Sequence, residues 1–366
     1  MDQPILSTLA DGRDVRFYAL PGHTIRPVPD VRPLPKRADG RRTEIRYDRA
    51  TGDWVTIAAL RQDRTYNPPA DRCPLCPSPR GDSSEVPASD YDVVVFENRF
   101  PSLSGAGAGA PTAPAGPMKG DLHAPGVGRC EVICFSSDHS ISFAELSHDH
   151  ARLVVDVWRQ RTAALLDLDG IEQVFCFENR GEEIGVTLSH PHGQIYGYPF
   201  PTPRTAAMLG QAEAFTARAA GRNLFADLLA REIGEQVRII ASNEHFTAFV
   251  PFAARWPVEV HIYPNRHVHN LTDLSERELD DLTSMYLDVL GRFDRLYSTP
   301  LPYISALHQY RAHGIQEHGY FHIELMSIRR SASKLKYLAG SESAMDAYIT
   351  DVTPEATAEF LNSVAT

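Results

Sequence analysis

The sequence has no long apolar run, fewer basic than acidic residues, and an odd number of cysteines. No stretch approaches the roughly 20 apolar residues that a membrane-spanning helix needs, so an integral membrane protein is not expected. Acidic residues outnumber basic ones, 47 to 36, and no basic patch large enough for a nucleic acid is visible. The 366 residues, 43% of them hydrophobic, predict a soluble globular chain long enough for two domains. Because the chain carries more acidic than basic residues, nearby basic side chains must hold any phosphate that the chain binds.

The N-terminal stretch and the cysteines indicate the compartment. The first twenty residues have no sustained apolar run and are not expected to be a signal peptide, because they carry Asp2, Asp11, Arg13, Asp14 and Arg16. The cysteines number five, and Cys73 and Cys76 form a C-x-x-C pair. In a reducing compartment this pair indicates metal binding or redox chemistry rather than a structural bridge. The cytoplasm is therefore the expected location.

An internal repeat divides the chain. Three short motifs recur 128 residues later without a gap, which indicates duplication: Glu131-Val132, His139 and Leu146-Ser147 become Glu259-Val260, His267 and Leu274-Ser275. Each copy predicts a strand, a turn, a histidine, a helix and a further strand. The helices are expected to start at Ser147 and Ser275, and the second start has a capping-box spacing to Glu278.

The repeat sets the expected fold. We predict an α+β protein with two tandem domains, 1–202 and 203–366, each an antiparallel sheet with packed helices. Thr205–Ile233 predicts a further long helical stretch, and the Gly, Ala and Pro content of Ser104–Gly120 predicts a flexible surface loop. The second copy ends in His322 and Glu324, so we expect it to lack the nucleophile of the first.

His190-Pro191-His192-Gly193-Gln194 is the most informative stretch. Alternate side chains share one face of an extended segment, so two imidazoles and an amide point the same way. Imidazole is a competent nucleophile toward phosphorus, and a second histidine can bind a metal. An isolated His-x-His pair can also be a half-buried structural pair, but Gly193 permits close approach to a ligand and the five-residue pattern favours phosphoryl chemistry.

This pattern resembles the transferase branch of the histidine-triad superfamily, in which Gln194 replaces the third histidine of the hydrolases. An amide keeps hydrogen-bond donors for a phosphate oxygen but cannot protonate a leaving group, which favours transfer over hydrolysis. The whole chain resembles the galactose-1-phosphate uridylyltransferase family. That resemblance implies two histidine-triad-like domains, His192 as nucleophile, UDP-glucose and galactose 1-phosphate as substrates, a uridylyl-histidine intermediate and a homodimer.

The resemblance also implies one structural zinc site. Its ligands are Cys73, Cys76, His139 and His190, a closed set of two thiolates and two imidazoles. A redox dithiol remains the alternative for the C-x-x-C pair. The other three cysteines lie in apolar runs and are expected to be core thiols: Cys130, Cys134 and Cys176.

Several polar residues match the family's substrate-binding positions. Arg61 and Arg64 match its phosphate-binding arginines, although two loop arginines are often only solvated surface charges. Asn98 and Asn179 match its nucleotide-contacting asparagines and are otherwise typical turn residues. Thr187 stands where the family usually has a serine.

The sugar-binding segment and a possible second metal lie near the C-terminus. Lys336, Gly340 and Glu342 match the family's sugar-binding segment, which its dimer inserts into the partner's site. A glutamine that usually follows is missing, and the chain has Asp346–Asp351 there. A second metal is considered at His308, His318, His322 and Glu324 by residue type, without a catalytic role.

Two competing functions remain open. One is a related nucleotide-sugar phosphorylase or adenylyltransferase that keeps the His192 intermediate but uses ADP-glucose. The other is a nucleotide-binding protein without catalysis, whose signature would be tight binding and no covalent adduct.

Overall fold

The computed structural model describes residues 3–36, 43–63, 68–105 and 120–365. Most of the loop predicted at Ser104–Gly120 lies outside these residues, and so does Arg64. Within them, no helix is long and apolar enough to cross a membrane.

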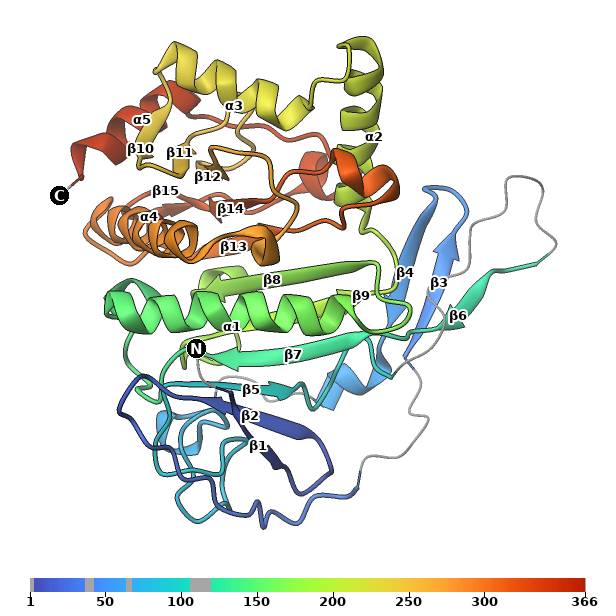
Figure 1. Cartoon of the computed structure of the whole chain (residues 1–366), viewed down its shortest axis with the longest axis vertical. Coiled ribbons are helices and arrows are strands. Elements are labelled where there is room, and N and C mark those ends of the chain that lie inside the picture. Colours follow the sequence, from blue (N-terminus) through green and yellow to red (C-terminus); the bar gives the residue numbers. More distant parts are fainter. Residues whose placement is uncertain (1–2, 37–42, 64–67, 106–119, 366) are drawn as a thin grey trace. The chain divides into compact units, whose positions relative to one another are not determined.

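The chain forms two compact units that interleave along the sequence. The first consists of residues 1–141, 156–176 and 190–207, and the second of residues 142–155, 177–189 and 208–366. In Figure 1 each unit has strands with helices packed against them. The domain boundary expected near residue 202 falls inside the last segment of the first unit and stays a prediction.

The strands of the first unit are antiparallel. They follow the order β1-β2-β5-β7-β9-β8, and the last residues of β8, from Phe177 on, belong to the second unit. The bounds are β1 Ile5–Thr8, β2 Asp14–Tyr18, β5 Val93–Glu97, β7 Arg129–Cys134, β8 Gln173–Arg180 and β9 His192–Tyr198. The central strands are apolar and buried, with Val94, Ile133 and Ile195 fully inside. The register places Cys134 opposite His192 and Val132 opposite Gln194.

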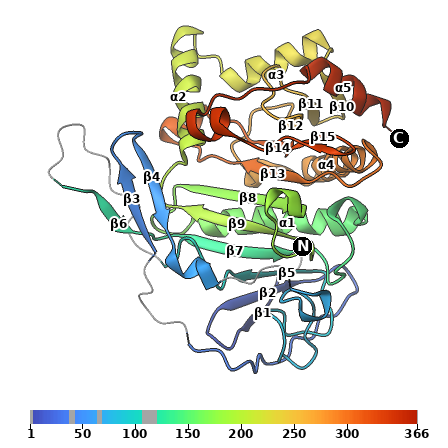
Figure 2. The same ribbon diagram turned by 180° about the vertical axis from the view of Figure 1, so that it is seen from behind.

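Helix α1 (His148–Leu166) covers this sheet with its second half. The ring of Trp158 meets Phe135 edge to face with centroids 6.0 Å apart. Arg161 forms a two-pronged pair with the buried Glu131 of β7, with both contacts at 2.8 Å. A smaller sheet, β4-β3-β6, stands at the side of the larger one (Figure 2) and consists of β3 Glu44–Asp48, β4 Asp53–Ile57 and β6 His123–Pro125.

The strands of the second unit are also antiparallel and follow the order β13-β14-β12-β11-β10. The bounds are β10 Ile239–Ser242, β11 Phe246–Phe249, β12 Val258–Pro264, β13 Tyr303–His308 and β14 His322–Ser327. A short hairpin follows, with β15 Arg329–Ser331 and β16 Lys334–Leu335. Helix α4 (Glu276–Arg295) packs on one face, where the hydroxyl of Tyr286 contacts that of Ser305 at 2.8 Å. Its predicted capping box, Ser275 with Glu278, is present.

The long helical stretch predicted at Thr205–Ile233 is two helices. Helix α2 (Pro203–Arg218) ends before Gly221, whose φ of +83° a side chain rarely tolerates. Helix α3 (Leu224–Glu235) then starts anew, because Asn223 accepts from the backbone N–H groups of its first turn. Both helices contribute to a core against the second sheet, and α5 (Pro354–Ser363) packs beside β10.

The two units repeat one order of elements: a strand, a long helix and two further strands. β7, α1, β8 and β9 correspond to β12, α4, β13 and β14. Cys134 pairs with His192 in the first unit, while Ile262, 128 residues after Cys134, pairs with Ile323 in the second. His322 and Glu324 lie on the other face of β14 from Ile323, because successive side chains of a strand alternate. The predicted α+β class with antiparallel sheets is confirmed.

Candidate active site and metal cluster

His192 is half-buried at the first position of β9. Its Nδ1 lies 2.8 Å from the carbonyl oxygen of His190. A carbonyl can only accept, so Nδ1 carries the proton and donates it, which leaves the lone pair of the neutral ring on Nε2. Burial lowers the pKa of His192, so the ring stays neutral and nucleophilic near neutral pH.

Gln194 follows two residues later on the same face of β9. Its Oε1 accepts from Asn98 Nδ2 at 3.4 Å and from the hydroxyl of Tyr196 at 3.1 Å. These two donors fix the orientation of the amide, because its oxygen must face them. The NH₂ group of Gln194 therefore points away from these two donors and can donate to another acceptor.

Asn98 directly follows β5 and is both a turn residue and a site residue. Its side-chain Oδ1 accepts from the backbone N–H of Phe100 at 2.9 Å, and its backbone N–H donates to the Cys130 carbonyl at 2.8 Å. The turn predicted for this position and the contact with Gln194 therefore coexist in one side chain.

Arg61 lies in the 3₁₀ turn η1 (Ala59–Asp63) and reaches the same cluster. Its Nη1 donates to the carbonyl of Phe100 at 3.2 Å and contacts the Tyr196 hydroxyl at 3.5 Å. These contacts give a guanidinium a fixed place near Gln194 instead of leaving it among surface charges.

Tyr196 is a member of the site that the sequence analysis missed. It is the third residue on the face of β9 that carries His192 and Gln194, and its hydroxyl connects Gln194 with Arg61. Burial raises the pKa of Tyr196, so the hydroxyl keeps its proton. Extending the alternation of His192 and Gln194 by one more step, two residues past Gln194, would have identified it.

The four predicted metal ligands form one cluster in the first unit. The ligand atoms of Cys73, Cys76, His139 and His190 all lie within 4.8 Å of one another. Sγ of Cys76 is 3.3 Å from His139 Nδ1 and 3.5 Å from His190 Nδ1. All five cysteines of the chain are free thiols. Two thiols and two imidazoles at these separations fit a tetrahedral metal such as zinc.

Outer contacts orient His190 toward the thiols. Its Nε2 donates to the Ser136 carbonyl at 2.8 Å, so Nδ1 turns its lone pair to the cluster. The hydroxyl of Tyr91 lies 2.8 Å from the same Nε2 and donates to the Leu75 carbonyl, inside the C-x-x-C turn, at 2.9 Å. Burial lowers the pKa of His190 to about 4, which keeps the ring neutral as a ligand must be. Tyr91 is not among the residues expected from the sequence.

Asn179 and Thr187 belong to the second unit. Asn179 is half-buried on β8, and Thr187 is half-buried in the segment after the turn η4 (Glu182–Ile184). Glu178, the neighbour of Asn179, accepts from the hydroxyl of Tyr303 at 2.8 Å. Burial raises the pKa of Glu178 to about 7.

The predicted sugar-binding residues gather in one turn. Nζ of Lys336 lies 3.3 Å from Glu342 Oε1, and the backbone N–H of Ala339 donates to Oε2 of the same carboxylate at 3.3 Å. Both charged side chains are buried. Gly340 opens the turn η7 (Gly340–Ala344), where an added Cβ would meet nothing within 4 Å.

A second group of possible ligands is buried in the second unit. It consists of His308, His322 and Glu324, and His318 is not part of it. The rings of His308 and His322 stack 4.6 Å apart, and their Nε2 atoms lie 3.3 and 3.6 Å from the Glu324 carboxylate. His261 adds a nitrogen 3.6 Å from the same carboxylate, a neighbour that the sequence analysis missed. Metal binding here stays a prediction.

Two family models match the chain one after the other. The family model described as galactose-1-phosphate uridyl transferase, N-terminal domain, matches residues 35–202, and its C-terminal counterpart matches residues 209–366. The galactose-1-phosphate uridylyltransferase of Streptomyces lividans is 49% identical over 82% of this chain and 79% of its own length. That of Thermotoga maritima is 34% identical over 87% of this chain and 97% of its own length.

Solved structures show the same fold. A uridylyltransferase structure superposes with a TM-score of 0.75 at 30% identity and covers 88% of this chain and 98% of its own. An ADP-glucose phosphorylase from Arabidopsis thaliana superposes with a TM-score of 0.66 at 21% identity, over 88% of this chain and 99% of its own, which shows a shared fold alone.

Proposed function

The chain belongs to the galactose-1-phosphate uridylyltransferase family, and on that premise we propose that it transfers UMP from UDP-glucose to galactose 1-phosphate, as an enzyme of galactose metabolism. The observation that carries the proposal is the state of His192. Its Nδ1 is held by the His190 carbonyl, and its Nε2 presents a lone pair beside Gln194. A neutral, oriented imidazole is the nucleophile that such a transfer needs.

The reaction proceeds in two displacements. Nε2 of His192 attacks the α-phosphorus of UDP-glucose, a P–N bond forms, and the bond to the bridging oxygen breaks, which releases glucose 1-phosphate. A phosphate oxygen of galactose 1-phosphate then attacks the uridylyl-histidine, and the P–N bond breaks to give UDP-galactose and neutral His192. The kinetics are therefore ping-pong.

Neighbouring side chains bind the phosphoryl oxygens as charge redistributes. Gln194 offers its NH₂ group, because Asn98 and Tyr196 occupy its oxygen. Arg61 supplies positive charge from the same cluster. The match with the family adds Arg64, Asn179 and Thr187. Since an amide gives no proton to a leaving group, water is a poorer acceptor than a sugar phosphate.

A zinc ion held by Cys73, Cys76, His139 and His190 has a structural role in this proposal. When bound, it supplies fixed coordination and no open position for substrate. The side chain of His190 belongs to that site while its carbonyl holds His192. The metal site therefore aligns the nucleophile through one residue.

Sugar binding, assembly and location complete the proposal. Lys336, Gly340 and Glu342 bind the hexose phosphate, supported by their common turn. A homodimer supplies this turn to a partner's site, as the family resemblance implies. The reducing cytoplasm suits a site that needs two free thiolates.

Intact-protein mass after brief incubation with UDP-glucose tests the proposal. The sample is quenched at alkaline pH because phosphoramidates of histidine hydrolyse in acid. We expect a gain of one UMP that disappears on addition of galactose 1-phosphate. An adduct with ADP-glucose alone would favour a phosphorylase or adenylyltransferase, and no adduct with either nucleotide sugar would favour a binding protein.

A further inference from the structure

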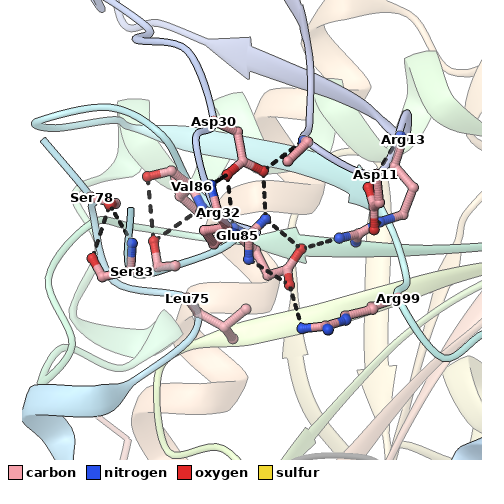
Figure 3. A network of polar contacts seen from close by, with 12 residues as sticks. Asp11, Arg13, Asp30, Arg32, Leu75, Ser78, Ser83, Glu85, Val86 and Arg99 are labelled. Carbon is pink, nitrogen blue, oxygen red and sulfur yellow. Dashed lines mark hydrogen bonds and ion pairs between the residues drawn. The ribbon is translucent and has the colours of Figure 1, made fainter. Parts of the chain in front are cut away.

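The N-terminal segment carries most of a buried ion cluster. The family match begins at residue 35, yet four residues of the cluster precede that point: Asp11, Arg13, Asp30 and Arg32. Arg13 and Arg32 both pair with Glu85, while Asp11 pairs with Arg13 and Asp30 with Arg32 (Figure 3). All five lie in the first unit. The cluster thus joins residues outside the matched segment to a residue within it, Glu85.

Arg13 stands at the centre of the cluster, with only 1% of its side chain exposed. Its Nε donates to Asp11 at 2.7 Å, and its Nη2 forms a short contact with Glu85. Its Nη1 donates to the backbone carbonyl of Glu97 at 2.7 Å. The planar guanidinium thus donates to two carboxylates and one carbonyl, each in a fixed direction.

The Glu97 carbonyl belongs to the peptide group that joins β5 to Asn98. The N–H of that same peptide donates to the Cys130 carbonyl at 2.8 Å. The peptide plane is therefore held at both ends, by Arg13 on one side and by β7 on the other. Its orientation determines where the Asn98 side chain points, and Asn98 Nδ2 donates to Gln194 Oε1.

Glu85 links the cluster to the metal-binding turn. Its carboxylate also accepts from Arg32 Nη1 at 2.9 Å, and its backbone N–H donates to the Pro74 carbonyl at 2.8 Å. Pro74 lies between the two cysteines of the C-x-x-C pair. Arg32, unlike Arg13, makes its side-chain contacts with carboxylates only, those of Asp30 and Glu85.

A gain in the free energy of folding is a weak explanation for a buried ion cluster of this kind. Replacing a buried ion group by apolar side chains is often neutral or stabilising, because charges pay a large desolvation penalty. Fixed donor directions are what an apolar replacement would not provide. Two contacts of the cluster reach the neighbours of Asn98: the bond from Arg13 to the Glu97 carbonyl at 2.7 Å, and the looser pair of Glu85 with Arg99 at 3.9 Å. Of the two, the bond from Arg13 acts on the peptide group of Asn98 itself.

We propose that Arg13 is a positioning residue for UMP transfer, which acts by holding the Glu97–Asn98 peptide so that Asn98 supports Gln194. The inference rests on the proposed function and on the roles of Asn98 and Gln194 in it. Arg13 contacts neither His192 nor a substrate in this scheme; its whole effect passes through Asn98.

A double-mutant cycle on the rate of UMP-adduct formation tests this path. Arg13→Lys keeps the positive charge but loses the fork that reaches three acceptors. We expect it to slow adduct formation on the order of tenfold, since small misplacements of binding groups cost rate. Asn98→Ala should cost a similar factor, and the double variant should lose little more than Asn98→Ala alone. Losses that multiply would overturn the proposal, because independent effects add in free energy.

The matched control is Arg32→Lys, which disturbs the same cluster without touching the Glu97 carbonyl. It should leave adduct formation within about twofold of the unchanged protein, because the side-chain contacts of Arg32 go to Asp30 and Glu85 and not to the Glu97–Asn98 peptide. An equal loss in Arg32→Lys and Arg13→Lys would show a general structural role and contradict the proposal. Metal content should be the same in both variants.

Two further conditions keep the outcome decisive. If Arg13→Lys does not fold, Arg13→Met combined with Glu85→Gln removes one cation and one anion together, with Glu85→Gln alone as its reference, and the same cycle with Asn98→Ala applies. Failure of the unchanged protein to form any adduct would overturn the proposed function. Adduct formation that Arg13→Lys leaves unaltered would overturn only the positioning role.

Discussion

The imidazole Nδ1 of His192 lies 2.8 Å from the carbonyl oxygen of His190, a residue whose own side chain points into the metal cluster. One residue therefore orients the nucleophile through its main chain and serves as a ligand through its side chain. The distinction matters for experiments, because chemistry at His192 and integrity of the metal cluster can be altered separately at other positions.

Replacing His192 by glycine should abolish the UMP adduct and leave the fold intact. The imidazole is the only nucleophile in the proposed scheme, and residue 192 is not a metal ligand, so metal content should stay unchanged. Intact mass after exposure to UDP-glucose, with metal analysis of the same sample, measures both. A variant that still gained one UMP would show that another residue is the nucleophile.

Replacing Cys73 by serine should lower metal content and the melting temperature by several degrees, because three ligands hold a structural metal far less well than four. The control is Cys176→Ser, since Cys176 is also a buried thiol but lies outside the cluster. Metal analysis distinguishes the two, since a buried hydroxyl lowers the melting temperature in both variants but only Cys73→Ser should lose metal. Equal metal content in both variants would exclude Cys73 as a ligand.

Replacing Tyr196 by phenylalanine should slow UMP transfer about threefold to tenfold, the value of one hydrogen bond. The change removes the donor to Gln194 Oε1 and the contact with Arg61, while the ring and its packing remain. Tyr198→Phe is the matched control, because Tyr198 packs on the ring of Tyr196 two residues further along β9. Rates of adduct formation should differ between the two variants. Identical rates would remove Tyr196 from the site.

Replacing Glu178 by glutamine should reduce the loss of stability at rising pH. Burial raises the pKa of Glu178 from 4.5 to about 7, so between these values the folded state binds more protons than the unfolded state. This carboxyl therefore favours folding fully at low pH, and its contribution falls as pH rises toward 7, by at most about 3 kcal/mol. Glutamine stays neutral and can still accept from Tyr303.

Urea unfolding of the protein and of Glu178→Gln at pH 5 and pH 8 measures this difference. The variant should gain relative stability at pH 8, and the two should be closest at pH 5. A constant difference in free energy of unfolding across this range would show that Glu178 has an ordinary pKa.

The local motifs could be predicted from the sequence because each depends on neighbours in the chain. The alternation at His192 and Gln194 and the capping box at Ser275 are of this kind, and the structure has both on the expected elements. The metal site at the C-x-x-C pair could be predicted only in part, because its other two ligands, His139 and His190, came from family resemblance and not from spacing.

Contacts that depend on backbone groups or on distant segments could not be predicted. The His190 carbonyl that orients His192 has no sequence signature, because every residue has a carbonyl. Tyr91 reaches His190 across 99 positions of sequence. The split of the predicted helix at Thr205–Ile233 was legible in Gly221 and Asn223, which typically end and begin helices.

The second unit keeps the alternation of polar side chains on β14 but uses it differently. His322 and Glu324 share one face of β14, and the Glu324 carboxylate lies 3.6, 3.3 and 3.6 Å from ring nitrogens of His261, His308 and His322. The buried residues Ile323 and Leu325 face the other way, into the core. A search of β9 and β14 for alternating polar side chains that start with a histidine would therefore find both copies, although only the first copy places an amide two residues after that histidine.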